Sequence, residues 1–184
     1  MRVCGLVLAA GGGTRYGRPK GLVRGADGVP WVARAVDVLR DGGCDGVVVL
    51  VGAAGDEVAA LVPEWASVVT VADWADGLAA TLRAGLATAS TEGWDAVAIT
   101  PVDTPDAAPA AVARVLGALR GRSPLVQAVY GGVPGHPVAI ARSHFAPLAE
   151  ALDGDRGARP YLAAHGVVEV ECADLWSGED VDRP

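Results

Sequence analysis

The chain has 184 residues, of which 51% are hydrophobic and 20% are charged, and it carries a formal net charge of -7. This length and composition predict one globular domain over residues 1–184 and exclude an intrinsically disordered chain. The acidic balance argues against a protein that binds nucleic acid or an anionic membrane surface. No apolar run is long enough to span a bilayer and no secretion signal opens the chain, so we expect a cytoplasmic protein whose three cysteines stay reduced.

Short apolar runs alternate with helical patterns along the chain. The apolar runs predict buried strands at residues 3–8, 47–51, 68–71, 96–100, 125–130 and 167–170. Apolar residues at helical spacing predict helices at residues 32–39, 58–62, 78–89, 112–119 and 145–152. The glycine- and proline-rich segment 131–137 is expected to form a loop inside the domain. This alternation predicts a three-layer α/β domain with a mostly parallel sheet, in which ligands bind beyond the carboxyl ends of the strands.

The first predicted strand runs into a glycine-rich segment with the sequence LAAGGGTRYGRPK, residues 8–20. It ends at Lys20, the only lysine among the 15 lysines and arginines of the chain. Arg15, Arg18 and Arg24 lie close to Lys20 in sequence, and residues 11–26 contain no carboxylate. Backbone N–H groups of a glycine turn attract anions, and lysine is a compact charge that reaches into narrow phosphate sites. The segment therefore predicts a triphosphate-binding loop; the alternative is one surface lysine left by chance in an arginine-rich composition.

Two common nucleotide-binding loops do not match this segment. A dinucleotide fingerprint requires a third glycine where Tyr16 stands, and an acid after the second strand, where Gly52 follows Val51. A Walker A loop requires lysine and a hydroxyl residue after the spaced glycines, but Arg18 and Pro19 follow Gly17.

The segment instead resembles the signature of the MobA-like nucleotidyltransferases, L-A-A-G-x-G/S-x-R-x-G-x-P-K. Further segments continue the resemblance in the same order: DWADG at 73–77 with TLRAG at 81–85, VDTP at 102–105, GVPGHPV at 132–138, GDRGAR at 154–159 and DVDRP at 180–184. The segments at 132–138 and 154–159 are similar to the branch of molybdenum cofactor cytidylyltransferases. The resemblance implies a single Rossmann-like nucleotidyltransferase domain.

The resemblance assigns roles to the glycine loop. Arg15 would contact the β- and γ-phosphates and Lys20 the α-phosphate, which makes them the expected catalytic cations. The expected nucleotide-binding set is Leu8, Ala9, Ala10, Gly11, Gly12, Gly13, Thr14, Arg15 and Lys20.

Two carboxylates are expected to hold one magnesium ion, Mg2+, which prefers hard oxygen ligands. Asp103 follows the fourth predicted strand, and Asp182 lies in the C-terminal motif, with Asp180 close enough to be confused with it. The alternative for Asp103 is a turn or helix-capping role before Pro105, and for Asp182 a solvated tail.

The acceptor is expected to contact His136, Asp155 and Arg159. His136 is expected to form a wall of the acceptor site and not to act as a base, because a phosphate monoester is already ionised at neutral pH. Asp155 and Arg159 could equally cap the helix that follows them.

We expect an enzyme that moves a nucleoside monophosphate from CTP to a phosphorylated small molecule, the molybdopterin cofactor, and releases pyrophosphate. Ala10 motivates the choice of CTP, because guanylyl-transferring relatives carry glycine there and a methyl group narrows the pocket. The alternatives are a guanylyltransferase, transfer to another phosphorylated acceptor, and a non-catalytic nucleotide-binding partner. A molybdoenzyme or its maturation chaperone is the expected protein partner.

Overall fold

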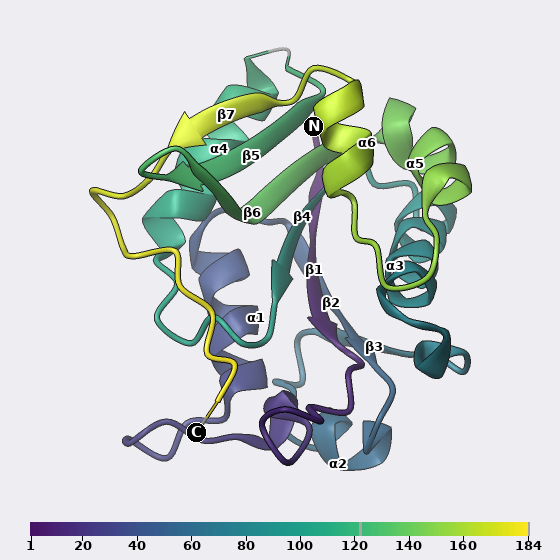
Figure 1. Cartoon of the computed structure of the whole chain (residues 1–184), viewed down its shortest axis with the longest axis vertical. Coiled ribbons are helices and arrows are strands. Elements are labelled where there is room, and N and C mark those ends of the chain that lie inside the picture. Colours follow the sequence, from purple (N-terminus) through teal and green to yellow (C-terminus); the bar gives the residue numbers. More distant parts are fainter. Residues whose placement is uncertain (122, 184) are drawn as a thin grey trace.

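The sheet at the centre of the molecule has seven strands in the order β3-β2-β1-β4-β6-β5-β7 (Figure 1). The computed structural model describes residues 1–121 and 123–183; Pro184, the last residue of the expected closing motif, lies outside these ranges. Every strand pairing is parallel except those of β6, which runs antiparallel to β4 and β5. The strands are β1 Val3–Ala9, β2 Gly46–Val51, β3 Ser67–Thr70, β4 Ala96–Pro101, β5 Leu125–Tyr130, β6 Val133–Ala141 and β7 Val168–Glu171.

Helices cover both faces of this sheet, and the expected three-layer α/β fold is confirmed (Figure 1). One face carries α1 Trp31–Asp41, α2 Gly55–Ala59 and α4 Pro109–Arg120. The other carries α3 Leu78–Thr91, α5 Phe145–Ala151 and α6 Arg159–Ala164.

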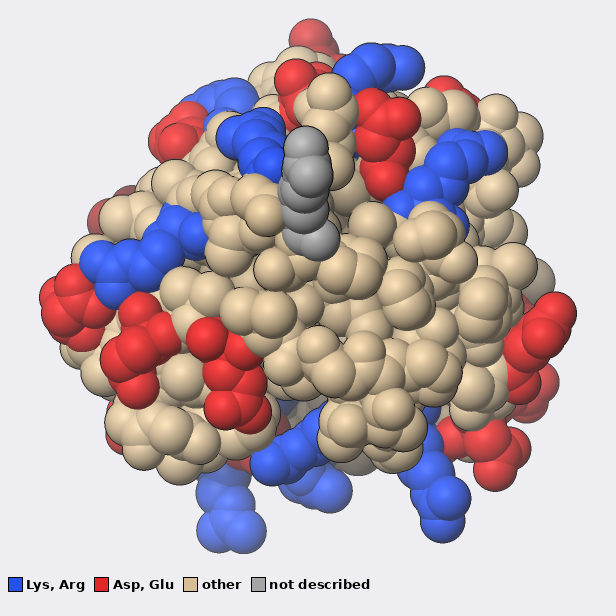
Figure 2. Space-filling model, turned by 90° about the horizontal axis from the view of Figure 1, so that it is seen from above, with Lys and Arg blue, Asp and Glu red and all other residues tan. Residues whose placement is uncertain are grey.

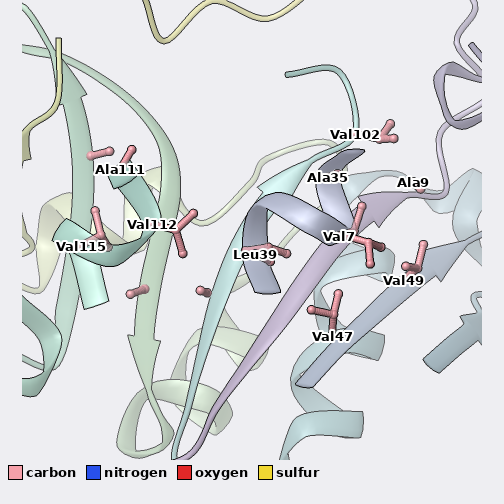
Figure 3. Packing of buried hydrophobic residues seen from close by; sticks show 14 of the residues in the cluster. Val7, Ala9, Ala35, Leu39, Val47, Val49, Val102, Ala111, Val112 and Val115 are labelled. Atoms are coloured by element: carbon pink, nitrogen blue, oxygen red, sulfur yellow. The ribbon is translucent and has the colours of Figure 1, made fainter. Parts of the chain in front are cut away.

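Side-chain periodicity produces the two cores. On the α1 and α4 face, Val7 and Val49 of the strands, Leu39 of α1, and Val112 and Val115 of α4 belong to one buried cluster (Figure 3). Because side chains alternate along a strand, the intervening residues enter the second core, beneath α3, α5 and α6. The small valine and alanine side chains of this chain therefore fill two closely packed layers.

The prediction of a loop over residues 131–137 was wrong for most of that segment. Gly131 and Gly132, with φ of 60° and 79°, form a tight turn between β5 and β6, and β6 begins at Val133. Two glycines with positive φ make a two-residue hairpin turn whose twist matches the flanking strands. The prolines of the segment are tolerated because the ladder is irregular there, with a register shift between Gln127 and Val129.

Charged side chains are dispersed over the end of the molecule opposite the glycine loop. Figure 2 shows cations and carboxylates around the rim of this end, with uncharged residues between them. Within the described ranges, no helix is both long and apolar enough to cross a membrane.

Candidate functional site

A cavity of about 790 Å³ opens at the carboxyl ends of β1 and β4. Parallel strands bring their C-terminal loops to one edge of a sheet, which is where α/β proteins bind ligands. The antiparallel β6 adds its N-terminal end to the same edge. The residues named from sequence that line the cavity are Leu8, Ala10, Gly11, Gly12, Gly13, Thr14, Arg15, Lys20, Asp103, His136, Asp155, Arg159 and Asp182.

Ala9 is the member of the expected nucleotide-binding set that does not line the cavity. It is the last residue of β1 and belongs to the core beneath α1. The alternation of side chains along the strand turns Leu8 toward the cavity and Ala9 away from it.

The glycine loop folds back on itself after β1. Gly13 has a φ of 60°, and a Cβ atom there would lie 1.8 Å from the carbonyl oxygen of Arg18. The N–H of Gly17 donates to the carbonyl of Gly13 at 2.8 Å. At Gly11, by contrast, a Cβ would meet nothing within 4 Å. Gly13 is therefore required by the turn itself, whereas Gly11 leaves open space that a ligand can approach.

Lys20 ends the loop and joins two distant carboxylates. Its Nζ lies 2.9 Å from Oδ2 of Asp103, in the turn after β4, and 2.8 Å from Oδ1 of Asp182, near the C-terminus. The lysine side chain is only 12% exposed. Arg15 approaches the same Asp182 at 3.9 Å but is 80% exposed. The expected phosphate-binding lysine and the expected metal ligands thus form one charged cluster.

These contacts change the proton affinity of the cluster. Burial lowers the pKa of Lys20, but hydrogen bonds to Asp182 and Asp103 outweigh it and raise the pKa above its ordinary value. The hydrogen bond from Lys20 holds the pKa of Asp182 below the usual range of a carboxyl. Both effects favour the charged forms of Lys20 and Asp182.

The carboxylates of the cluster have the chemistry of a hard-cation site. Asp103, Asp180 and Asp182 each place one ligand atom within 4.8 Å of the others. Oδ1 of Asp103 is buried and has no hydrogen-bond partner among the described residues. An unpartnered buried carboxylate oxygen is costly, and a divalent cation would satisfy it. Helix capping does not account for Asp103, because α4 is preceded by Ala108 at its cap position.

The C-terminal segment, residues 177–183, crosses back toward the glycine loop (Figure 1). Gly178 lies against Tyr130, where a Cβ would come within 2.3 Å of the ring, and Trp176 donates its Nε1–H to the Tyr130 hydroxyl. Nearer its end, the N–H of Val181 donates to the carbonyl of Asp103 at 2.9 Å. The segment is thus held in place at both ends, and these contacts position Asp182 beside Lys20.

The expected acceptor residues line the remaining wall of the cavity. Nδ1 of His136 is buried without a partner within the described ranges. Burial lowers the pKa of His136, although the Ile99 carbonyl and the charges of Asp103 and Asp180 oppose this, so the ring is neutral at pH 7. Neither Asp155 nor Arg159 caps the following helix, because α6 has Ala158 at its cap position and no side-chain capping bond.

Sequence reasoning missed Gln127, a buried residue of β5 that also lines the cavity. It stands in an apolar run that predicts only a strand. A signal was nevertheless present: the chain contains no asparagine, and Gln127 is its only glutamine.

Comparison with known proteins places the chain among nucleotidyltransferase-like domains. A protein-family model described as a MobA-like NTP transferase domain matches residues 5–170. The chain is 35% identical to nicotine blue oxidoreductase of Paenarthrobacter nicotinovorans over 192 residues, which covers 98% of this chain and 92% of that protein.

Solved structures with a similar fold include proteins related to the same family. Rv0371c of Mycobacterium tuberculosis superposes with a TM-score of 0.86 at 30% identity, covering 100% of this chain and 93% of that chain. A second structure of Rv0371c, in complex with manganese, matches with a TM-score of 0.77 at 27% identity and covers 94% and 89%. Molybdopterin-guanine dinucleotide biosynthesis protein A of Archaeoglobus fulgidus, 16% identical with a TM-score of 0.73 and coverage of 98% and 93%, shares the fold.

Proposed function

The chain belongs to the MobA-like NTP transferase family, and from that premise we propose that it transfers a nucleoside monophosphate from CTP to the phosphate of the molybdopterin cofactor. A phosphate oxygen of the acceptor attacks the α-phosphorus of the nucleotide, a new P–O–P bond forms, and pyrophosphate leaves. The observation that carries the proposal is the convergence of the glycine loop, Lys20 and the carboxylate cluster at one end of a single cavity.

The loop end of the cavity suits a triphosphate. The open backbone at Gly11 offers N–H groups to phosphate oxygens, and Arg15 projects freely enough to reach a ligand's outer phosphates. Lys20 would stabilise the charge that develops as pyrophosphate leaves. A magnesium ion held by Asp103 and Asp182, with Asp180 as an available third carboxylate, would supply charge neutralisation on the triphosphate.

The choice of CTP rests on Ala10, which is buried and lines the cavity beside the loop. Its methyl group reduces the room for a purine more than for a pyrimidine. The choice of molybdopterin rests on the motifs around His136 and Arg159. A molybdoenzyme or its maturation chaperone would receive the product in the cytoplasm.

Two measurements with the purified protein test the proposal. Thermal shift with CTP, UTP, GTP or ATP in the presence of magnesium reports which nucleotide stabilises the native state. Pyrophosphate release with molybdopterin then separates an enzyme from a nucleotide-binding partner. Selective stabilisation by CTP without any pyrophosphate release, with molybdopterin or other phosphorylated acceptors, would contradict catalysis and favour the binding role.

A second candidate function comes from the relative named as an oxidoreductase, because 35% identity extends over 98% of this chain. Although the glycine loop lacks the dinucleotide fingerprint, the open backbone at Gly11 offers N–H groups that would suit the diphosphate of a reduced nicotinamide dinucleotide. The discriminating measurement is the loss of nicotinamide absorbance with heteroaromatic oxidants in the absence of any NTP. Turnover there, without pyrophosphate release from CTP, would favour the redox function.

A further inference from the structure

The only side-chain amide of the chain, Gln127, is buried in the wall of the cavity. It is 7% exposed and lies on β5, on the face whose neighbouring positions, Leu125 and Val138, belong to the apolar core beneath α3, α5 and α6. A polar group in such a layer costs free energy unless its hydrogen bonds are satisfied.

One hydrogen bond fixes the orientation of this amide. Nε2 of Gln127 donates to the carbonyl oxygen of Gly135 at 3.1 Å, across the β5–β6 pair. Gly135 is itself closely packed, because a Cβ there would lie 2.8 Å from the Tyr130 ring. Since a carbonyl can only accept, the amide nitrogen must point toward Gly135, and the amide oxygen is held in a defined position.

The other half of the amide remains available. Among the described residues, none donates a hydrogen bond to its oxygen. This oxygen is not fully buried, and it is open to the cavity that Gln127 lines. The nitrogen keeps a second N–H. An acceptor and a donor side by side form the pattern by which a glutamine amide pairs with two adjacent groups on a heterocycle edge.

The surroundings of Gln127 define the shape and charge of what it could bind. Leu82, Ile99, Val138 and Leu162 line the same cavity and offer apolar surface. His136 lies in the same wall, and its Nδ1 is buried there without a partner among the described residues. Apolar walls with one oriented amide favour a flat, uncharged ring that carries its polar groups on its edge.

We propose that Gln127 is the residue that recognises the acceptor's ring, by pairing with a cyclic amide edge (an N–H beside a carbonyl) of a planar heterocycle bound between the apolar walls. This inference rests on the proposed function, since it identifies the ring as part of the acceptor. It assigns to Gln127 a role in acceptor binding and none in the chemistry at the α-phosphate.

The test measures ring binding without any nucleotide. The probes are pterin, which has the cyclic amide edge, and 2-amino-4-methoxypteridine, which has the same ring system but lacks the N–H and carries an added methyl group. We expect the unaltered protein to bind pterin about tenfold or more tightly than the methoxy ring, the effect of hydrogen bonds left unpaired in a buried site. In Gln127→Met, which keeps the length of the side chain, the ratio of the two dissociation constants should fall to near one.

Control variants separate recognition from folding. Thr100→Val removes a buried polar group that does not line the cavity and should leave the ratio unchanged. CTP-induced thermal stabilisation should be the same in Gln127→Met and the unaltered protein; Gln127→Leu is the second variant if the first does not fold.

The outcomes distinguish this inference from the proposed function. Equal ratios in Gln127→Met and the unaltered protein, or no preference for pterin in the unaltered protein, would overturn the role of Gln127 even if nucleotidyl transfer is observed. A Gln127-dependent preference in a protein that transfers no nucleotide would support the ring pocket and overturn the proposed function.

Discussion

Lys20 and Asp103, which lie 83 positions apart in the sequence, form an ion pair of 2.9 Å in the lining of the cavity, and Asp182 is a second carboxylate partner of the same ammonium, at 2.8 Å. A metal ion bound through the other oxygens of these carboxylates, among them the unpartnered Oδ1 of Asp103, would compete with the lysine for their negative charge. This competition would weaken the ion pairs of the ammonium and favour its contact with a phosphate. Metal binding and delivery of Lys20 to the nucleotide are therefore expected to be coupled.

Replacing Lys20 by methionine should have opposite effects on metal binding and turnover. Without the competing ammonium, manganese should bind the nucleotide-free protein more tightly, by up to roughly fivefold, the range that such ion pairs stabilise. Turnover should fall by roughly two to three orders of magnitude, as for the loss of one preorganised charge. Calorimetric titration with manganese and initial rates measure the two effects.

Two further variants control the Lys20 experiment. Arg120→Met removes one positive charge at the end of α4, away from the cavity lining, and should alter neither property. Lys20→Arg should not restore turnover, because the planar guanidinium of arginine does not replace the compact ammonium of lysine. Weaker manganese binding in Lys20→Met would show that lysine and metal do not compete.

The carboxylates of the cluster are expected to contribute unequally to magnesium binding. Asp103→Asn should raise the magnesium concentration for half-maximal activity by at least roughly tenfold. Replacing a residue that only hydrogen-bonds to a metal ligand already lowers metal affinity by about this factor. Asp182→Asn should act in the same direction, and a chain truncated after Ser177 should resemble it. Asp180→Asn decides whether the third carboxylate takes part. An unchanged magnesium dependence in the truncated chain would exclude the tail from the site.

Gly178→Ala should weaken metal binding without touching a carboxylate. Its φ is +79° and a Cβ would lie 2.3 Å from the Tyr130 ring, so the tail must move. Gly166→Ala is the matched control, because its φ of +70° imposes a similar backbone cost but the space around it is open. Both variants should lose similar stability, and only Gly178→Ala should require more magnesium. Equal magnesium requirements would mean that contact with Tyr130 does not position Asp182.

Glu171 should stabilise the β5–β6 hairpin in a pH-dependent way. Its carboxylate accepts hydrogen bonds from the N–H groups of Ala173, Gly131, Gly132 and Cys172, and these hold its pKa below the ordinary value of 4.5. A depressed carboxyl pKa in the folded state contributes stability above the unfolded pKa, and this is lost as pH falls through the folded pKa.

Urea unfolding of Glu171→Gln measures this contribution. Its midpoint should lie below that of the unaltered protein at pH 7, and the difference should shrink as the pH falls below 4.5. Glu169→Gln removes a charge from an exposed position of the same strand and serves as the control. A difference that persists unchanged in acid would refute an ionised Glu171 as its source.

The base preference should depend on Ala10. We expect kcat/KM for CTP to exceed that for GTP by roughly ten- to two-hundredfold, the range by which a pocket discriminates between substrates that differ in size at one position. Ala10→Gly should narrow this gap, mainly by improving GTP, and UTP tests whether cytosine itself is read. A preference for GTP in the unaltered protein would refute the cytidylyl assignment without affecting the family or the fold.

Most predicted strands and helices agree with the structure, but the helix predicted at residues 58–62 is observed at Gly55–Ala59, and α6 was not predicted. Continuous apolar runs became β1, β2 and β4, and the 3.6-residue period became α1 and α4. The error at β6 arose because proline and glycine indicate turns locally, whereas pairing with β4 and β5 determines whether such a segment becomes a strand.

For the candidate site, the loop motif identified Lys20, and position after a strand identified Asp103. That these two side chains, with Asp182, would neutralise one another was not predictable, because it depends on how separate loops approach in space. Gln127 was missed although it is the only glutamine in the chain, because a polar residue in an apolar run does not by itself show that its side chain faces a cavity.

The sequence by itself determined the family, the α/β layering and the position of the glycine loop after β1, because these depend on short-range periodicity and on a turn that only glycine can adopt at Gly13. Tertiary structure alone decided which charges meet and which amide lines the cavity. Contacts between Lys20 and Asp182 span 162 positions, and packing of the sheet edge, the hairpin and the tail sets such distances. Local patterns do not encode these distances, because each is the combined result of every element that lies between the two residues.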